Sequence, residues 1–346
     1  MQPPQTDPTV IFELFRGSYG SELLTAAVAH FNLFGLLQHQ PLTAEQLQLE
    51  LGLQPRALIV LTTALRSMGL LGRNSDGQFQ LTALSEEHLV RDAEFDVGNY
   101  LGLAAGAPGV LEMVERLKSN QPANLDTAGA AFIYRDGMRS AMEQSELAEH
   151  FTQALAGRAR NVAPALAAAI DVQPEDVLLD VGGGTGIYSL ALLERHPTLR
   201  AIVLDRPEVL KIAERYARQS QHGHRLQCVS ADMFADELPA ADLILLSNIL
   251  HDWDVPECQQ LVRRCAAALK PGGRLLIHDV LLNDQLDGPL PIALYSAALF
   301  TLTEGRAYSA AEFSSWLRDA GLEPQPPQPT LVHCHLIAGL RPRATH

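Results

Sequence analysis

The sequence has little of three features that would each indicate a particular class of protein. It has four cysteines and no CxxC spacing, which disfavours a disulfide scaffold and a zinc ribbon. No apolar run reaches the roughly 18 residues that span a bilayer, and the first residues, MQPPQTDPTV, lack the basic and apolar regions of a signal peptide. We therefore expect a cytoplasmic protein with reduced cysteines and no membrane partner.

Positive charge is scarce as well. Lysine and arginine total 26 against 40 aspartates and glutamates, which gives a formal net charge of −14. Such a surface repels polyanions, so we expect no nucleic-acid partner. Core-forming side chains, in contrast, are plentiful: 47% of the 346 residues are hydrophobic, and this length favours two domains.

Residues 1–95 predict a mostly helical, winged-helix-like dimerisation domain. The segment Leu23 to Leu37 is apolar without a clear polar face, which predicts a helix buried against a second subunit of a homodimer. A helix capped by Thr43, a second helix from about Pro55 and a hairpin with its turn at Asp76-Gly77 complete the pattern.

A winged helix can read DNA or serve as a scaffold. Its charged side chains between residues 42 and 71 are Glu45, Glu50, Arg56 and Arg66, which sum to zero, whereas a groove-reading helix carries a basic surface. The scaffold is favoured, and a winged-helix regulator that senses a ligand stays as the alternative from another class.

Residues 96–170 predict a helical linker that contributes to a substrate pocket. Aromatic and sulfur side chains at helical spacing can cover a pocket or belong to the core. The candidate pocket residues are Tyr134, Met138 and Met142 in this linker, and Trp253, Leu294 and Phe300 further along the chain.

Residues 171–346 alternate between strands and helices. The strand candidates include DVLLDVG, LRAIVLD, RLQCVSAD, ADLILLSNIL and GRLLIHDVLL. Helical patterns separate them, except between RLQCVSAD and ADLILLSNIL. This alternation predicts an α/β fold with a Rossmann-like, doubly wound parallel sheet. Ligands of such sheets bind at the carboxyl ends of the strands, so the residues there are the candidates for function.

The first of these strands ends in a glycine loop. Gly182, Gly184 and Gly186 follow a GxGxG spacing, and the GxGxxG pattern of dinucleotide binders fails at Ile187. Asp180 precedes the first glycine, and a carboxylate there disfavours a pyrophosphate and suits a ligand with an ammonium group.

Two more acids end the next two strands. Asp205 is placed to accept ribose hydroxyls, and Asp232 with Met233 offers a carboxylate and an apolar face to a base. Three acids in register at successive strand ends are difficult to explain as helix caps alone. S-adenosylmethionine, which combines an amino-acid moiety, a ribose and an adenine, fits this set.

His251 follows the next strand, in the sequence HDW. A neutral imidazole with a pKa near the reference value of about 6.5 can take a phenol proton at neutral pH. His333 and His335 share one strand face near the C-terminus, but no third ligand is evident and we expect no metal.

Taken together, LLDVGGGTG, VLDRPEV, ADMF, ILHDW, LKPGGRLLIHDVLL and EGRAYSAAEFSSWLRDAGL resemble the class I O-methyltransferases that modify small aromatic hydroxyl compounds in plants and bacteria, the caffeate and hydroxyindole type. The resemblance covers nearly the whole chain. It implies a homodimer, a small-molecule acceptor and no metal. It also implies that Gly182, Asp205, Asp232 and Met233 bind the cofactor, that Ser247 lies beside it, and that His251 is the general base.

The family pattern also places two acids beside the histidine. Asp279 matches the first, but Ala307 stands at the position of the second, with Glu304 three residues upstream. The sequence therefore predicts that Asp279 alone orients His251. Two alternatives on the same fold stay open: a C-methyltransferase, and a relative that uses the cofactor without transferring its methyl group.

Overall fold

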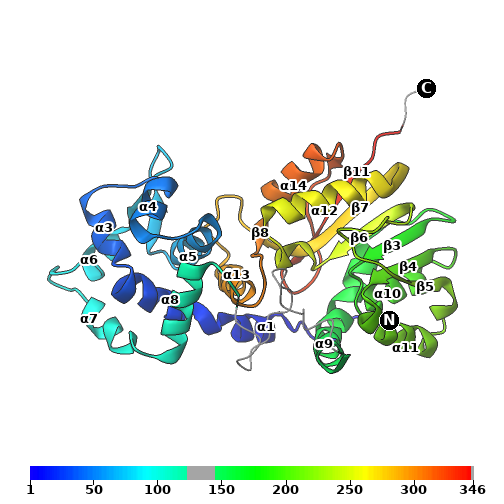
Figure 1. Cartoon of the computed structure of the whole chain (residues 1–346), viewed down its shortest axis with the longest axis horizontal. Coiled ribbons are helices and arrows are strands. Elements are labelled where there is room, and N and C mark those ends of the chain that lie inside the picture. Colours follow the sequence, from blue (N-terminus) through cyan, green and yellow to red (C-terminus); the bar gives the residue numbers. More distant parts are fainter. Residues whose placement is uncertain (123–144, 344–346) are drawn as a thin grey trace. The chain divides into compact units, whose positions relative to one another are not determined.

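The computed structural model describes residues 1–122 and 145–343, and the chain divides into two compact units (Figure 1). The sheet unit comprises Met1–Phe12, Phe132–Leu281 and Tyr308–His346, and the helical unit comprises Glu13–Ala131 and Leu282–Ala307. The domain boundaries predicted at residues 95 and 170 each fall inside one of these units. Each unit combines segments that are distant in sequence, whereas the predicted domains were continuous stretches of chain.

The sheet unit is built on a mostly parallel sheet with the strand order β10-β11-β7-β6-β3-β4-β5. The parallel strands are β3 (Val177–Val181), β4 (Arg200–Asp205), β5 (Leu226–Ser230), β6 (Ala241–Ser247) and β7 (Leu269–Leu282). The antiparallel additions are β11 (Cys334–Leu340), β10 (Gln328–Pro329) and β9 (Glu323–Pro324), the last two of which pair with β11. A short strand β8 (Tyr308–Ser309) also pairs with β7. The predicted α/β class and doubly wound sheet are confirmed.

Helices cover both faces of this sheet (Figure 1). One face carries α12 (Val255–Ala268) and α14 (Ala310–Asp319), and the other carries α9 (Ser145–Ala169), α10 (Ile187–Arg195) and α11 (Pro207–Gln219). Strands covered on both sides need apolar residues at consecutive positions, which explains the nearly continuous runs in β3 and β6. The loops at the carboxyl ends of the strands are then the places where polar groups converge.

The helical unit contains the predicted winged-helix-like pattern. Thr43 caps α4 (Ala44–Leu51) through a capping box with Gln46, α5 (Pro55–Ser67) follows, and β1 (Leu71–Arg73) pairs with β2 (Phe79–Leu81). The remaining α-helices with described residues here are α2 (Gly20–Thr25), α3 (Leu33–His39), α6 (Ala83–His88), α7 (Gly98–Leu101), α8 (Pro108–Ser119) and α13 (Leu290–Leu302). Helix α1 (Thr9–Arg16) precedes them.

The apolar segment Leu23 to Leu37 is not a single helix. After α2 it passes through a π-helical turn (Ala26–His30) and a left-handed Asn32 (φ 45°) before α3 begins. Its large apolar side chains belong to the core that this unit forms with its own α5, α8 and α13. The sequence predicted correctly that this segment is buried, but it did not predict that the same chain buries it.

No described helix is by itself long and apolar enough to cross a membrane, although the bent pair Thr9–His30 and Leu33–His39 passes the test of length and composition when taken together.

The two arginines of α5 bear on the regulator alternative. Arg56 is buried and donates to the Asn120 side chain and to the carbonyls of Thr303 and Gly305. Arg66 donates to the Leu286 carbonyl at 3.0 Å. Because both guanidinium groups bind backbone and side-chain oxygens within the helical unit, α5 does not present the basic surface that groove reading requires.

Candidate active site

The glycine loop after β3 has a backbone that suits glycine and little else. Gly182, Gly184 and Gly186 have φ values of 67°, 57° and 71°, in the left-handed region where side chains are strained. A Cβ on Gly182 would lie 2.5 Å from Ile249 Cδ1, whereas a Cβ on Gly184 would meet no atom within 4 Å. The loop is therefore tight at its first glycine and open at its second, where a ligand can approach the backbone.

Asp205, at the end of β4, fixes this loop. Its Oδ2 accepts the Gly184 N–H at 2.9 Å, and its Oδ1 accepts the Arg206 N–H at 2.7 Å. A carboxylate has about four acceptor positions, so two remain for hydroxyl groups of a ligand. Burial raises the pKa of Asp205 despite these two hydrogen bonds.

Asp180 lies beneath the same loop. Its side chain is buried and accepts a hydrogen bond from Ser189 Oγ at 2.7 Å. Burial raises the pKa of Asp180 to about 7, and the negative charge of Asp205 acts in the same direction. Two neighbouring carboxyl groups that repel each other, one buried and one half-buried, are stabilised by a nearby cation, so the loop fits a ligand with ammonium and sulfonium charges.

The third predicted acid, Asp232, is beside the second. The preceding residue, Ala231, donates to the Asp205 carbonyl at 3.3 Å, and Asp232 Oδ1 accepts the Phe234 N–H at 2.8 Å. Asp232 is exposed and Met233 is half-buried. The structure thus brings the three acids and the glycine loop together at adjacent strand ends, as predicted, and their contacts with a cofactor stay a prediction.

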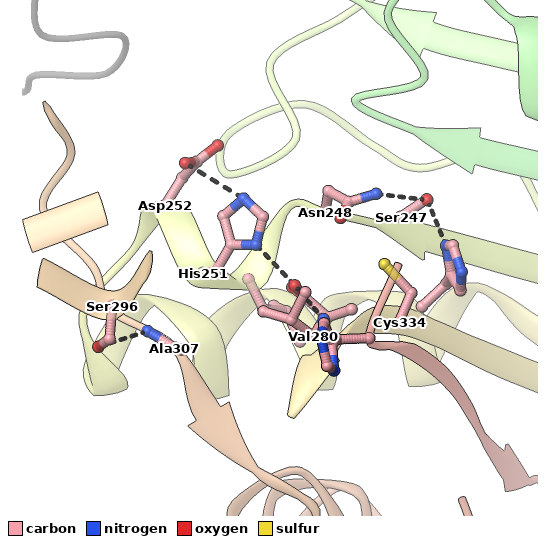
Figure 2. Close-up of polar contacts among 12 residues, drawn as sticks. Ser247, Asn248, His251, Asp252, Val280, Ser296, Ala307 and Cys334 are labelled. Carbon is pink, nitrogen blue, oxygen red and sulfur yellow. Dashed lines mark hydrogen bonds and ion pairs between the residues drawn. The ribbon is translucent and has the colours of Figure 1, made fainter. Parts of the chain in front are cut away.

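His251 lies in a short 3₁₀ turn, Leu250–Asp252, which we call the histidine turn. The imidazole is 5% exposed, and its Nδ1 is 2.6 Å from Asp279 Oδ1 on β7. Its Nε2 is 3.7 Å from Asp252 Oδ1, and Figure 2 shows Asp252 beside that edge of the ring. Burial lowers the pKa of His251 most strongly, but Asp279 and Asp252 outweigh it, so the net shift is upward.

Asp252 is a candidate site residue that the sequence reasoning missed. Its carboxylate comes from the residue next to His251, on the other edge of the ring from Asp279. That Asp279 alone orients His251 stays a prediction. Burial raises the pKa of Asp252 to about 6, against the opposing effect of His251. Ala307 is fully buried and its N–H donates to Ser296 Oγ at 3.1 Å (Figure 2). The sequence signal for this contact was the adjacent pair His251-Asp252. Side chains of consecutive residues usually point in different directions, and the tight 3₁₀ turn is what brings the Asp252 carboxylate to the imidazole.

The histidine turn is supported from several sides. Cys258 Sγ on α12 donates to the Leu250 carbonyl at 3.1 Å, and Tyr308 Oη donates to the Trp253 carbonyl at 2.6 Å. Asp254 then caps α12 through the Val255 N–H. Backbone carbonyls held in this way keep His251 in one position, which a proton acceptor requires.

Ser247 and His278 form a separate polar pair behind the site. Ser247 Oγ is 2.9 Å from His278 Nδ1, and Thr330 Oγ1 is 3.0 Å from His278 Nε2. Burial lowers the pKa of His278 to about 3, so this imidazole is neutral and bridges two hydroxyl groups. The contact of Ser247 with a cofactor stays a prediction.

The candidate pocket residues have packing roles where the structure describes them. Trp253 is 4% exposed in the core of the sheet unit, edge-on to Phe234 with ring centroids 4.7 Å apart. Leu294 and Phe300 belong to the core of the helical unit, with the Phe300 ring under the Arg56 guanidinium. Their burial gives the predicted acceptor contacts no support. Tyr134, Met138 and Met142 lie outside the described residues.

Within residues 1–122 and 145–343, no group of three histidine, cysteine, aspartate or glutamate side chains has the geometry of a metal site. His335 Nδ1 is instead 3.2 Å from the His333 carbonyl oxygen.

A doubly wound sheet with a glycine loop and acids at successive strand ends fits a class I methyltransferase. Comparison with known families agrees: residues 115–323 match the O-methyltransferase domain, and residues 12–91 match the O-methyltransferase dimerisation domain. The chain belongs to the S-adenosylmethionine-dependent O-methyltransferases that carry this dimerisation domain.

Three relatives illustrate the range of the family. The chain is similar to 3-hydroxy-5-methyl-1-naphthoate 3-O-methyltransferase of Streptomyces sahachiroi, with 35% identity over 92% of this chain and 90% of that protein. It is 29% identical to L-tyrosine C(3)-methyltransferase of Streptomyces lavendulae, over 89% of this chain and 85% of that protein. The crystal structure of an O-methyltransferase family 2 protein from Planctomyces limnophilus in complex with apigenin is similar over 98% of both chains, with a TM-score of 0.89 and 46% identity.

Proposed function

We propose that this enzyme transfers the methyl group of S-adenosylmethionine to a hydroxyl on a small aromatic or polyketide-like acceptor, with His251 as the general base. The 2.6 Å contact between His251 Nδ1 and Asp279 carries the proposal. This contact favours the tautomer in which Nδ1 donates to the carboxylate and Nε2 keeps its lone pair as the proton acceptor.

The chain's own groups then perform three tasks. His251 Nε2 takes the acceptor's hydroxyl proton, which makes that oxygen a stronger nucleophile. Asp279 and Asp252 stabilise the imidazolium that results, from opposite edges of the ring. When bound, S-adenosylmethionine supplies the methyl group as an electrophilic carbon on a sulfonium. The glycine loop, Asp180 and Asp205 would hold it, and positioning accounts for the rest of the rate enhancement.

The acceptor class follows from the relatives. One relative is named for a hydroxynaphthoate and another is in complex with the flavone apigenin, so planar phenols are the first compounds to assay. We expect incubation with methyl-labelled cofactor to add one methyl group to a phenol oxygen, located by mass spectrometry and NMR. No transfer to any member of a panel of flavones, hydroxynaphthoates and polyketide phenols would contradict this acceptor class.

A C-methyltransferase is the second candidate, because a relative of 29% identity is named as one. The same assay separates the two reactions. A methyl group attached to a ring carbon would reject O-methylation and would remove the need for a base at the hydroxyl.

The pH dependence of kcat/KM gives a test of Asp252. Protonated His251 cannot act as a base, so activity rises with pH through the raised pKa of His251, above its usual value of about 6.5. Asp252→Asn removes one of the charges that raise this pKa, and we expect the rising limb to move to lower pH. Asp319→Asn, an exposed acid on α14, is the control. An unmoved limb would show that Asp252 does not act on the base.

We also infer that the enzyme is a homodimer, with α1 at the interface. The match to the dimerisation domain supports this, and α1 exposes four large apolar side chains: Val10 (62%), Ile11 (71%), Leu14 (78%) and Phe15 (79%). An apolar face of this kind is costly in water unless a partner covers it.

The double substitution Leu14→Glu and Phe15→Glu is expected to convert the dimer to a monomer of 37.6 kDa, measured by light scattering. Leu49→Glu, which changes a single leucine of 83% exposure on α4, should leave the dimer intact. A dimer that survives the double substitution at micromolar concentration would remove α1 from the interface.

A further inference from the structure

Arg158, on α9, reaches the residue that leads into the histidine turn. Its Nη1 donates to Asn248 Oδ1 at 2.5 Å, and its Nη2 donates to Cys334 Sγ at 3.0 Å. Asn248 is the first residue after β6, and it has a left-handed backbone (φ 57°) that residues other than glycine adopt only with support. Arg158 thus links α9 and β11 to the point where the chain leaves the sheet.

Asn248 is fixed through its other groups as well. Its N–H donates to the His278 carbonyl at 2.8 Å, and its Nδ2 donates to Ser247 Oγ at 3.1 Å. Figure 2 shows Asn248 beside Ser247, on the segment that continues to His251. The direction of the backbone at Asn248 determines where the imidazole, three residues later, is placed.

Arg158 also acts on His251 through its charge. Among the residues that the structure describes, the charged groups that act on His251 include Asp279 from β7, Asp252 from the histidine turn and Arg158 from α9. Burial lowers the pKa of His251, the two carboxylates raise it above its usual value, and Arg158 opposes the carboxylates. The same guanidinium lowers the pKa of Asp252, where burial is the largest influence and raises it.

We propose that Arg158 is a positioning residue for methyl transfer: it holds Asn248, and with it the histidine turn, in place, and its positive charge balances the two carboxylates beside His251. This role rests on the proposed function of His251 as the base. A base must be neutral before it can accept a proton. The two carboxylates favour the protonated imidazole, and the positive charge of Arg158 acts in the opposite direction. The arginine therefore lets the site keep two acids for stabilising the imidazolium while it limits their effect on the free base.

The experiment compares Arg158→Met, Arg158→Lys and Asn248→Gly with wild-type enzyme. Arg160→Met is the matched control, because it removes an exposed arginine from the same helix, where Arg160 binds Tyr216 Oη. The His251 imidazole is titrated by NMR in the cofactor-free enzyme, with its signal assigned by its absence from His251→Gln. The values of kcat and kcat/KM are measured against pH on the same samples.

We expect Arg158→Met to raise the pKa of His251 by about half to one unit, to move the rising limb of kcat/KM to higher pH by the same amount, and to lower kcat at neutral pH roughly tenfold. Arg158→Lys keeps the charge but cannot reproduce the two-point contact, so it should lower kcat with little change in the pKa of His251. Asn248→Gly keeps the left-handed backbone without the side chain, and it should act like Arg158→Lys.

A wild-type pKa of His251 in Arg158→Met would overturn the role of the charge, and a wild-type kcat in both Arg158→Lys and Asn248→Gly would overturn the role in positioning. Should Arg158→Met fail to fold, Arg158→Gln replaces it for the titration. The titration reports the charge of His251 whether or not that residue is the base. A shifted pKa in Arg158→Met together with full turnover in His251→Ala would reject the proposed function and leave the electrostatic effect of Arg158 standing.

Discussion

Replacement of His251 by alanine is expected to lower kcat by roughly 10²–10⁴, the usual range for loss of a general base, while the affinity for the cofactor stays close to that of the wild type. The two effects separate because the groups that would hold the cofactor, the glycine loop and the acids at the ends of β3, β4 and β5, lie on other segments than the histidine turn. Single-turnover kinetics measures the first quantity, and calorimetry with S-adenosylhomocysteine, the demethylated product, measures the second.

Two further variants provide reference values for the loss of kcat in His251→Ala. Asp279→Asn keeps a hydrogen-bond partner at 2.6 Å from the ring but removes the charge that supports the imidazolium, so its kcat should fall less than that of His251→Ala. His39→Ala, which truncates an exposed histidine of α3, should retain full activity. Full turnover by His251→Ala across the pH range would show that alignment alone drives the reaction and that the buried dyad is structural.

The second large effect is expected at the glycine loop. Gly184→Val should weaken the binding of S-adenosylmethionine and of S-adenosylhomocysteine by about 1–3 kcal/mol, or roughly 5- to 150-fold. A β-branched side chain is strained at φ 57°, and it would enter the space that is empty within 4 Å of the position of its Cβ. It would also disturb the N–H that Asp205 accepts.

The chain offers a matched control for the backbone strain. Gly52, which ends α4, has φ 65° and also meets no atom within 4 Å of the position of a Cβ. Gly52→Val should therefore lower thermal stability to a similar extent without changing cofactor affinity in calorimetry. Equal affinities for Gly184→Val and wild type would place the cofactor elsewhere, and equal losses in the two variants would attribute the effect to strain alone.

Local sequence pattern was sufficient to predict the parallel sheet, and the position of the glycine loop and of the acids at its carboxyl edge. A strand buried on both faces is apolar at nearly every position, and a left-handed turn favours glycine. A short contiguous stretch of sequence is therefore enough to predict β3, β6 and the loop at Gly182. The strand-end acids follow from the same logic, since parallel strands bring their carboxyl ends to one edge.

Long-range and conformational features were not accessible in this way. Arg158 meets Asn248 across 90 residues, and no spacing in the sequence connects them. Asp252 reaches the His251 ring only because the chain adopts a tight 3₁₀ turn there, which no short motif specifies. The segment Leu23 to Leu37 shows the same limit, because hydrophobicity determines that a helix is covered and leaves open which chain covers it.

The raised pKa of Asp180, beneath the glycine loop, predicts a pH dependence of product inhibition. With a pKa of about 7, Asp180 can gain or lose a proton near neutral pH at little cost. Methyl transfer removes the positive charge of the sulfonium. The carboxylate of Asp180 would therefore favour S-adenosylmethionine over S-adenosylhomocysteine, whereas the neutral acid would discriminate less between them. As pH rises through 7, we expect the enzyme to prefer S-adenosylmethionine over S-adenosylhomocysteine more strongly. S-adenosylhomocysteine should then compete less effectively for the cofactor site. We therefore expect Asp180 to make the exchange of S-adenosylmethionine for its demethylated product sensitive to pH, independently of the proton that His251 would accept.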